Sequence, residues 1–220
     1  MINWKNLYEK LSDMNRIVLS THENPDGDGL GCAYAMHHIA KKMNIESKII
    51  TATKFSKQYN FLNQDNCIEL YDYDIHYNWI KDADAAFIFD VGDFVRLRDV
   101  GRALTENKIY TFNIDHHPSL ENSSFNENYV DTAAAATGEM IYEFIKKNEI
   151  NFTKDEAIGV YTAVMTDTGS FRHSNTNSNC HKIAMECIEL GVNSSRVYQS
   201  IYENRSCLLY TSPSPRDDEL

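Results

Sequence analysis

Four short segments of this chain carry aspartates and histidines of the kind that bind divalent metal ions. They contain His22, Asp26 and Asp28; Asp90; Asp115, His116 and His117; and Asp167. Imidazole and carboxylate ligands without cysteine suit a hard or borderline ion such as Mn²⁺ or Mg²⁺. One ion rarely accepts so many protein ligands and still leaves room for a substrate, so the number of ligands predicts two ions.

Three of these segments come directly after short apolar runs. The runs are RIVLST at residues 16–21, AAFIFD at residues 85–90 and KIYTFNID at residues 108–115. Such runs are typical of parallel strands covered on both faces, and open α/β sheets place their sites at the carboxyl ends of these strands. We therefore expect the segments to lie together at one edge of a sheet.

Helices are expected between the strands, because apolar residues recur there at spacings of three and four. The expected helices cover residues 3–14, 31–43, 94–107, 133–148, 153–166 and 178–190, with another near 55–62, and a further strand covers 45–51. This alternation predicts the α/β class, with a mainly parallel β-sheet flanked by helices. The aromatic run at residues 71–79 is expected to be a loop packed on the domain, although it could instead stack a nucleobase.

Each segment also has a simpler interpretation. Residues 26–29 could form only a turn, since Asp and Gly are favoured there. A dinucleotide loop is disfavoured because two carboxylates would repel a pyrophosphate, and a calcium loop because Leu30 stands where an oxygen ligand is needed. Asp90 could be a helix N-cap, and His37–His38 is expected to be a packing feature. The combination of four segments favours the metal site.

The composition is that of a globular protein of 220 residues, enough for one large domain or two small ones. The net charge of −11 argues against long duplex DNA as a partner, because such binding normally needs a basic face. The sequence shows no apolar run that could span a membrane and no signal peptide. Its five cysteines are therefore expected to be reduced thiols in a cytoplasmic protein.

The four segments resemble, in order and context, the four motifs of the DHH phosphoesterase family. The quoted motifs are His22-x-x-x-Asp26-x-Asp28, Asp90, Asp115-His116-His117 and Asp167, and the resemblance runs from about Arg16 to Phe171. The stretch Phe171-Arg-His-Ser-Asn175 is similar to that of the branch that comprises bifunctional oligoribonucleases and 3′-phosphoadenosine-5′-phosphate (pAp) phosphatases. The related manganese pyrophosphatases usually differ there.

The resemblance implies two Mn²⁺ ions that share one ligand, with Mg²⁺ or Co²⁺ as alternatives. Its implied ligands are His22, Asp26 and Asp90 for one ion, and Asp28, Asp90, His116 and Asp167 for the other. Asp115 would orient His116 by a hydrogen bond, as outer ligands of metal sites commonly do. His117 and Arg172 would contact the scissile phosphate, which the planar guanidinium suits.

The implied activity is hydrolysis of short oligoribonucleotides or pAp. The alternatives are an inorganic pyrophosphatase, a cyclic-dinucleotide phosphodiesterase and a metal-binding regulatory domain without turnover. Relatives of this kind carry a second, smaller substrate domain with a Gly-rich motif, and nothing here matches it. We expect residues 1–206 to be the catalytic domain and residues 207–220, which resemble a translated sequencing adapter, to be a non-native tail. The oligomeric state is left open, with a homodimer as one option.

Overall fold

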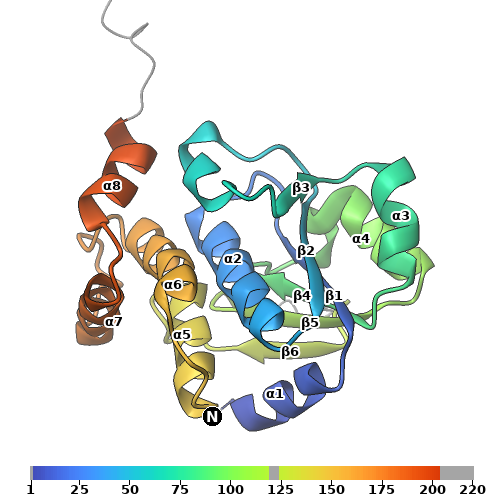
Figure 1. Cartoon of the computed structure of the whole chain (residues 1–220), viewed down its shortest axis with the longest axis horizontal. Coiled ribbons are helices and arrows are strands. Elements are labelled where there is room, and N and C mark those ends of the chain that lie inside the picture. The colour runs from blue at the N-terminus through green and yellow to red at the C-terminus, as the bar shows by residue number, and fades with distance from the viewer. Residues whose placement is uncertain (1, 119–123, 204–220) are drawn as a thin grey trace, which may run out of the picture.

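Six parallel strands form one sheet between two layers of helices (Figure 1). The structure, a computed structural model, describes residues 2–118 and 124–203, so the tail expected at 207–220 lies outside the described residues. The strands are β1 (Arg16–Thr21), β2 (Glu46–Thr51), β3 (Ile68–Leu70), β4 (Ala85–Phe89), β5 (Tyr110–Asp115) and β6 (Glu127–Val130). Every strand pairs with its neighbour in parallel, which confirms the predicted class.

The strand order, β3-β2-β1-β4-β5-β6, reverses its direction between β1 and β4. These two strands lie side by side, with Thr21 in register with Phe89. At such a reversal the connections leave the sheet toward opposite faces and open a crevice at the carboxyl ends of the strands. The fold therefore provides a site where His22 and Asp90 follow β1 and β4.

Alternate residues of the strands enter two separate cores. Ile17 and Leu19 of β1 belong to the larger core, whereas Val18 belongs to the smaller one. The larger core is covered by α1 (Trp4–Ser12), α2 (Gly27–Lys42), α5 (Thr137–Lys147) and α6 (Lys154–Asp167). The smaller core is covered by α3 (Tyr73–Lys81) and α4 (Arg98–Glu106). Beyond α6 lie α7 (Ser178–Glu189) and α8 (Ser194–Tyr198) (Figure 1).

Several elements differ from the sequence-based expectation. The aromatic run is the helix α3 and not a loop, because the Asp72 carboxylate caps it by accepting from the N–H groups of Asp74 and Ile75. The helix expected at 133–148 begins only at Thr137. The helix expected at 94–107 is a 3₁₀ turn, Phe94–Leu97, followed by α4, and the segment near 55–62 is 3₁₀ as well, over Lys57–Leu62. The short strands β3 and β6 were not predicted.

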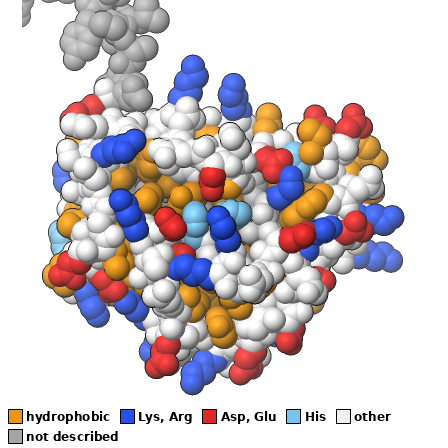
Figure 2. All heavy atoms as spheres, viewed as in Figure 1, with side chains coloured by type: hydrophobic (Ala, Val, Ile, Leu, Met, Phe, Trp, Pro, Cys, Tyr) orange, Lys and Arg blue, Asp and Glu red, His pale blue; other side chains and the backbone are white. Residues whose placement is uncertain are grey.

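No helix in the described ranges is both long and apolar enough to cross a membrane. On the face seen in Figure 2, basic and acidic side chains are interspersed, and they do not separate into one basic patch.

Candidate metal centre

The first segment lies where β1 leads into α2. His22 follows β1, and Asp26 is the N-cap of α2, where its Oδ1 accepts from the N–H groups of Asp28 (3.1 Å) and Gly29 (3.2 Å). The cap begins the helix at Gly27 and not at residue 31 as predicted. Asp28 consequently lies in the first turn of α2, where its side chain is buried.

Close packing of α2 against α6 holds Asp28 near Asp167, the last residue of α6. A Cβ added at Gly159 would lie 2.4 Å from the carbonyl oxygen of Gly31, and one added at Gly31 would lie equally close to that of Gly159. The two helices therefore approach so closely that only glycine fits on either side. This contact sets the separation of the two helix ends that carry candidate ligands.

Replacing Gly159 with alanine should push α6 away from α2. We expect a loss of about 1–3 kcal/mol in the free energy of unfolding, as for other overpacked positions, and weaker Mn²⁺ binding. Urea unfolding and Mn²⁺ titration measure the two effects. Gly92→Ala is the matched control for stability, because an added Cβ there meets no atom closer than 3.8 Å. Equal stabilities of the two variants would contradict the packing argument.

Asp90 lies at the centre of the cluster. It follows β4 with a φ of +60°, a left-handed conformation that is uncommon for a non-glycine residue, and its N–H donates to the carbonyl oxygen of Ile114. Its carboxylate lies 3.4 Å from His22 Nε2, 3.2 Å from His117 Nδ1 and 3.7 Å from His116 Nε2. Asp90 is not a helix N-cap, because Asp93 caps the 3₁₀ turn that follows.

Two groups of candidate ligands lie on either side of Asp90. In the first, His22 Nε2 is 3.5 Å from the carboxylate of Asp26. In the second, His116 Nε2 is 3.8 Å from Asp28 and 3.7 Å from Asp167. Together with Asp90, the ligand atoms of His22 and Asp26 lie within 4.8 Å of one another. The ligand atoms of Asp28, His116 and Asp167 also lie within 4.8 Å of one another.

The spacing and the lack of partners fit bound cations. Two ligands each about 2.1 Å from one ion lie about 3.0–3.4 Å apart, close to the separations seen here. His116 Nε2 is buried and has no hydrogen-bond partner among the described residues. Buried polar atoms are normally satisfied, so this unpaired nitrogen points to a ligand between the side chains.

The negative charges of the clustered carboxylates also favour a bound cation. Burial, together with the carboxylates of Asp90 and Asp167, raises the pKa of Asp28 well above its ordinary value. Burial lowers the pKa of His22, but hydrogen bonds to Asp26 and Asp90 outweigh it and raise that pKa to about 10. Without metal, the site therefore gathers protons to offset its carboxylates.

The Asp115 carboxylate lies against His117, whereas the resemblance implied that it would orient His116. Its Oδ1 accepts from the backbone N–H of His117 (3.0 Å) and lies 2.9 Å from His117 Nδ1, so it orients His117 and not His116. The ring of His116 is instead held by the carbonyl oxygen of Ala134, 3.3 Å from its Nδ1. The chain turns after β5, so consecutive histidines face different partners.

Arg172 is the one predicted site residue that the structure does not bring into contact with the cluster. It is exposed, and its Nε donates to the carbonyl oxygen of Gly169.

The sequence analysis assigned no role to Asn175, which links the segment before α5 to the end of α6. Its side-chain amide donates to the carbonyl oxygens of Ala135 (2.9 Å) and Asp167 (3.2 Å). The sequence feature that could have indicated this role is the amide side chain that directly follows the Phe-Arg-His-Ser run.

The N-terminus of α5 was also missed, because its contribution comes from the backbone. The N–H groups of Thr137 and Gly138 donate to the carboxylate of Asp28 at 2.7 and 2.9 Å. A helix N-terminus stabilises a negative charge, so these bonds hold the carboxylate in place.

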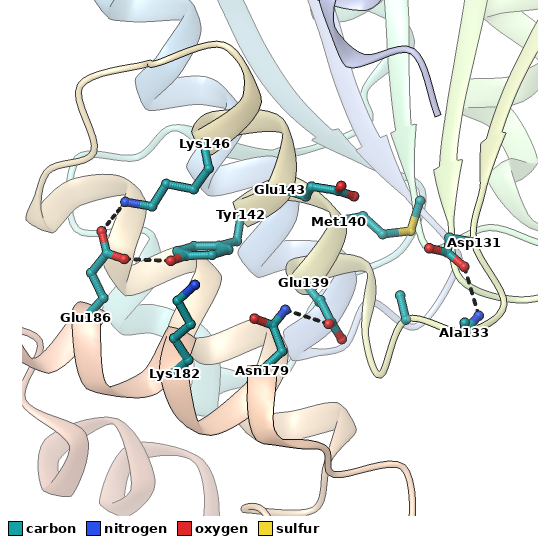
Figure 3. Close-up of a pocket in the computed structure, with 11 residues that line it drawn as sticks. Asp131, Ala133, Glu139, Met140, Tyr142, Glu143, Lys146, Asn179, Lys182 and Glu186 are labelled. Atoms are coloured by element: carbon teal, nitrogen blue, oxygen red, sulfur yellow. Dashed lines mark hydrogen bonds and ion pairs between the residues drawn. The ribbon is translucent and has the colours of Figure 1, made fainter. Parts of the chain in front are cut away.

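A separate cavity of about 720 Å³ lies between α5 and α7 (Figure 3). Its polar side chains largely satisfy one another: Glu186 accepts from Tyr142 and pairs with Lys146, and Asn179 donates to Glu139. The cavity shares only the segment around Ala134 with the metal centre. We therefore place the chemistry at the aspartate and histidine cluster.

The fold and the cluster define a parallel α/β domain with a group of carboxylates and histidines at the carboxyl edge of its sheet. The chain belongs to the DHH family: the family's N-terminal domain matches residues 16–164. The family predicted from the four motifs is thus confirmed.

Comparison with individual proteins agrees with this membership. The chain is 27% identical over 202 residues to the bifunctional oligoribonuclease and PAP phosphatase NrnA of Bacillus subtilis. This match covers 90% of this chain and 61% of that protein. It is 22% identical over 187 residues to a probable manganese-dependent inorganic pyrophosphatase of Streptococcus equi subsp. zooepidemicus, with 80% of this chain and 56% of that protein covered.

A solved structure, that of an exopolyphosphatase-related protein from Bacteroides fragilis, shares the fold with a TM-score of 0.85 at 21% identity. The match covers 92% of this chain and 61% of that one. This chain spans between 50% and 61% of the length of the curated relatives it matches.

Proposed function

We propose that this chain carries the catalytic centre of a phosphoesterase that uses two Mn²⁺ ions to hydrolyse short oligoribonucleotides, pAp, or both. The observation that supports this most is the position of Asp90 between two groups of ligand atoms, each with one histidine and further carboxylates. A carboxylate so placed can contribute one oxygen to each of two ions. In this proposal His22, Asp26 and Asp90 hold one ion, and Asp28, Asp90, His116 and Asp167 hold the other.

Bound there, two divalent ions would lower the pKa of a water molecule and neutralise charge that develops on the phosphoryl oxygens. The chain's own residues fix where this chemistry occurs. Asp28 is held by the two N–H groups of α5, and the His116 ring by the carbonyl oxygen of Ala134. The ligands are thus positioned before any substrate arrives.

His117 is the side chain best placed to meet a phosphate. It stands beside Asp90, yet its side chain is 51% exposed, and Asp115 fixes its orientation. In the absence of metal, hydrogen bonds to Asp115 and Asp90 raise its pKa to about 10, and an imidazole held in this way by Asp115 can donate from its other ring nitrogen to an anionic substrate. Arg172 is proposed as a second phosphate contact, because in the described chain only its Nε is engaged.

The role of Asp115 can be tested by substitution. Asp115→Asn should lower phosphate release about 10–100-fold, as for other residues that orient a functional histidine, and should leave Mn²⁺ binding unchanged. In a His117→Ala background the same substitution should cause little further loss, because both act through one side chain. Steady-state kinetics and Mn²⁺ titration provide the readouts. A fall in Mn²⁺ affinity would instead indicate that Asp115 acts through His116.

The substrate class can be tested with a panel of phosphoesters. The net charge of −11 and the interspersed charges on the face seen in Figure 2 disfavour a long polymer, so small anionic substrates fit best. Phosphate or nucleotide release is measured with Mn²⁺ from pAp, from di- to pentanucleotide RNA, from pyrophosphate and from a cyclic dinucleotide. We expect release from pAp or short RNA to be fastest.

The remaining outcomes separate the alternatives. Faster release from pyrophosphate would assign the chain to the pyrophosphatases, and exclusive cleavage of the cyclic dinucleotide would assign it to the phosphodiesterases of that substrate. Binding of two Mn²⁺ ions with no hydrolysis of any substrate would indicate a regulatory metal-binding domain.

A further inference from the structure

A second group of metal-ligating side chains lies away from the proposed centre. Ligand atoms of His37, Asp65 and Cys67 lie within 4.8 Å of one another. His37 is on α2, nine residues after Asp28, which places it about 14 Å further along the helix at 1.5 Å per residue. Asp65 and Cys67 belong to the loop before β3, so the group joins two separate elements.

The loop that carries two of these residues is firmly held. The Asn63 side chain accepts from the N–H of Ile68 (2.7 Å) and donates to its carbonyl oxygen (3.1 Å), which closes residues 63–68 into a tight loop. Between the two candidate ligands, Asn66 adopts a left-handed φ of +57°. This conformation suits asparagine and lets the chain bend between Asp65 and Cys67.

The third residue is held from the opposite side. His37 Nδ1 lies 2.8 Å from Ser47 Oγ, so a residue at the start of β2 fixes the orientation of the imidazole ring. A hydrogen bond of this kind behind a histidine is the usual support of a metal ligand. The imidazole and the Cys67 side chain are half-buried and Asp65 is exposed, so the group is open to solvent on one side.

We propose that His37, Asp65 and Cys67 form a second metal site, which binds a borderline transition-metal ion such as Zn²⁺. Zn²⁺ accepts nitrogen, oxygen and sulfur ligands together, whereas Mn²⁺ and Mg²⁺ favour oxygen. The Asp65 carboxylate and a deprotonated Cys67 thiol together carry two negative charges, which balance the charge of the ion. Three protein ligands leave the fourth position for water. Binding displaces the thiol proton, so uptake of the ion should release a proton.

Co²⁺ is the probe that distinguishes this site from the centre at Asp90. A cobalt–thiolate bond gives a charge-transfer absorption band in the near ultraviolet, and the ligands proposed at the Asp90 centre include no thiolate. The whole chain is stripped of metal, kept reduced with a phosphine and titrated with Co²⁺. We expect a thiolate band that rises to the intensity of one thiolate-bound Co²⁺ per chain, even when further Co²⁺ enters the Asp90 centre, and that disappears on addition of excess Zn²⁺.

Variants assign the band to its residues. Cys67→Ser should abolish it, and His37→Gln should weaken Co²⁺ binding by at least about tenfold. Cys32→Ser is the matched control, because Cys32 lies 3.5 Å from Asp28 in the other centre; this variant and Asp90→Ala should both keep the band. Absence of the band in the wild-type chain, its persistence in Cys67→Ser, or its loss in Cys32→Ser alone would overturn the proposal. Because none of these readouts depends on hydrolysis, they are independent of the proposed activity.

Discussion

Asp90→Ala should lower Mn²⁺-dependent phosphate release by about 10³-fold or more and prevent binding of the metal pair. The reason is that this carboxylate stands between the two ligand groups, so its removal takes a ligand from both. Loss of metal catalysis costs several kcal/mol of transition-state stabilisation, and each 1.36 kcal/mol is tenfold in rate. Phosphate release from pAp and metal content after dialysis against Mn²⁺ measure the two effects.

Asp93→Ala is the matched control for this variant. Asp93 lies three residues further on, and its carboxylate only caps a 3₁₀ turn by accepting from the N–H of Val95. We expect its metal content and turnover to stay near those of the wild-type chain. Near-normal turnover in Asp90→Ala with unchanged metal content would show that the proposed centre is wrong.

Asp28→Ala should reduce stability even in the absence of metal. The Asp28 carboxylate is buried and accepts from two N–H groups at the start of α5, so its removal leaves both donors without a partner. Unsatisfied buried donors cost about 1–3 kcal/mol each, and relief of repulsion with Asp90 and Asp167 offsets part of this. We expect the free energy of unfolding to fall by about 2–4 kcal/mol, measured by urea unfolding with a chelator present.

Asp167→Ala provides the contrast, because it should lose a metal ligand without this structural cost. Its carboxylate is 30% exposed and accepts one long hydrogen bond, from Asn175 at 3.4 Å. We expect its stability without metal to stay within about 1 kcal/mol of the wild type, while Mn²⁺ binding and turnover are lost. If both variants unfold at the same urea concentration, then Asp28 is not the residue that joins α2 to α5.

The parts of the fold that the sequence predicts are those whose burial leaves a simple pattern. β1, β4 and β5 are covered on both faces, so each reads as an apolar run, and the acids that follow mark the carboxyl edge. β3 has only three residues and β6 lies at the sheet edge with a polar sequence, so neither leaves such a pattern. The helix α3 was hidden because its buried positions, His76 and Ile80, are few.

At the site, residue types could be predicted from the sequence but several contacts could not. Which histidine Asp115 orients depends on the turn after β5, which neither residue type nor spacing determines. The support given to Asp28 comes from backbone N–H groups, which have no sequence signature. The close approach of Gly31 and Gly159 joins residues far apart in the chain, so it becomes visible only when α2 and α6 are packed.

The proposed two-metal centre is tested most directly by anomalous diffraction from a crystal of this chain grown with Mn²⁺. We expect two peaks about 3.5–4 Å apart, one bound by His22 and Asp26, the other by Asp28, His116 and Asp167, with Asp90 contacting both. A single peak, or two peaks of which Asp90 contacts only one, would contradict it.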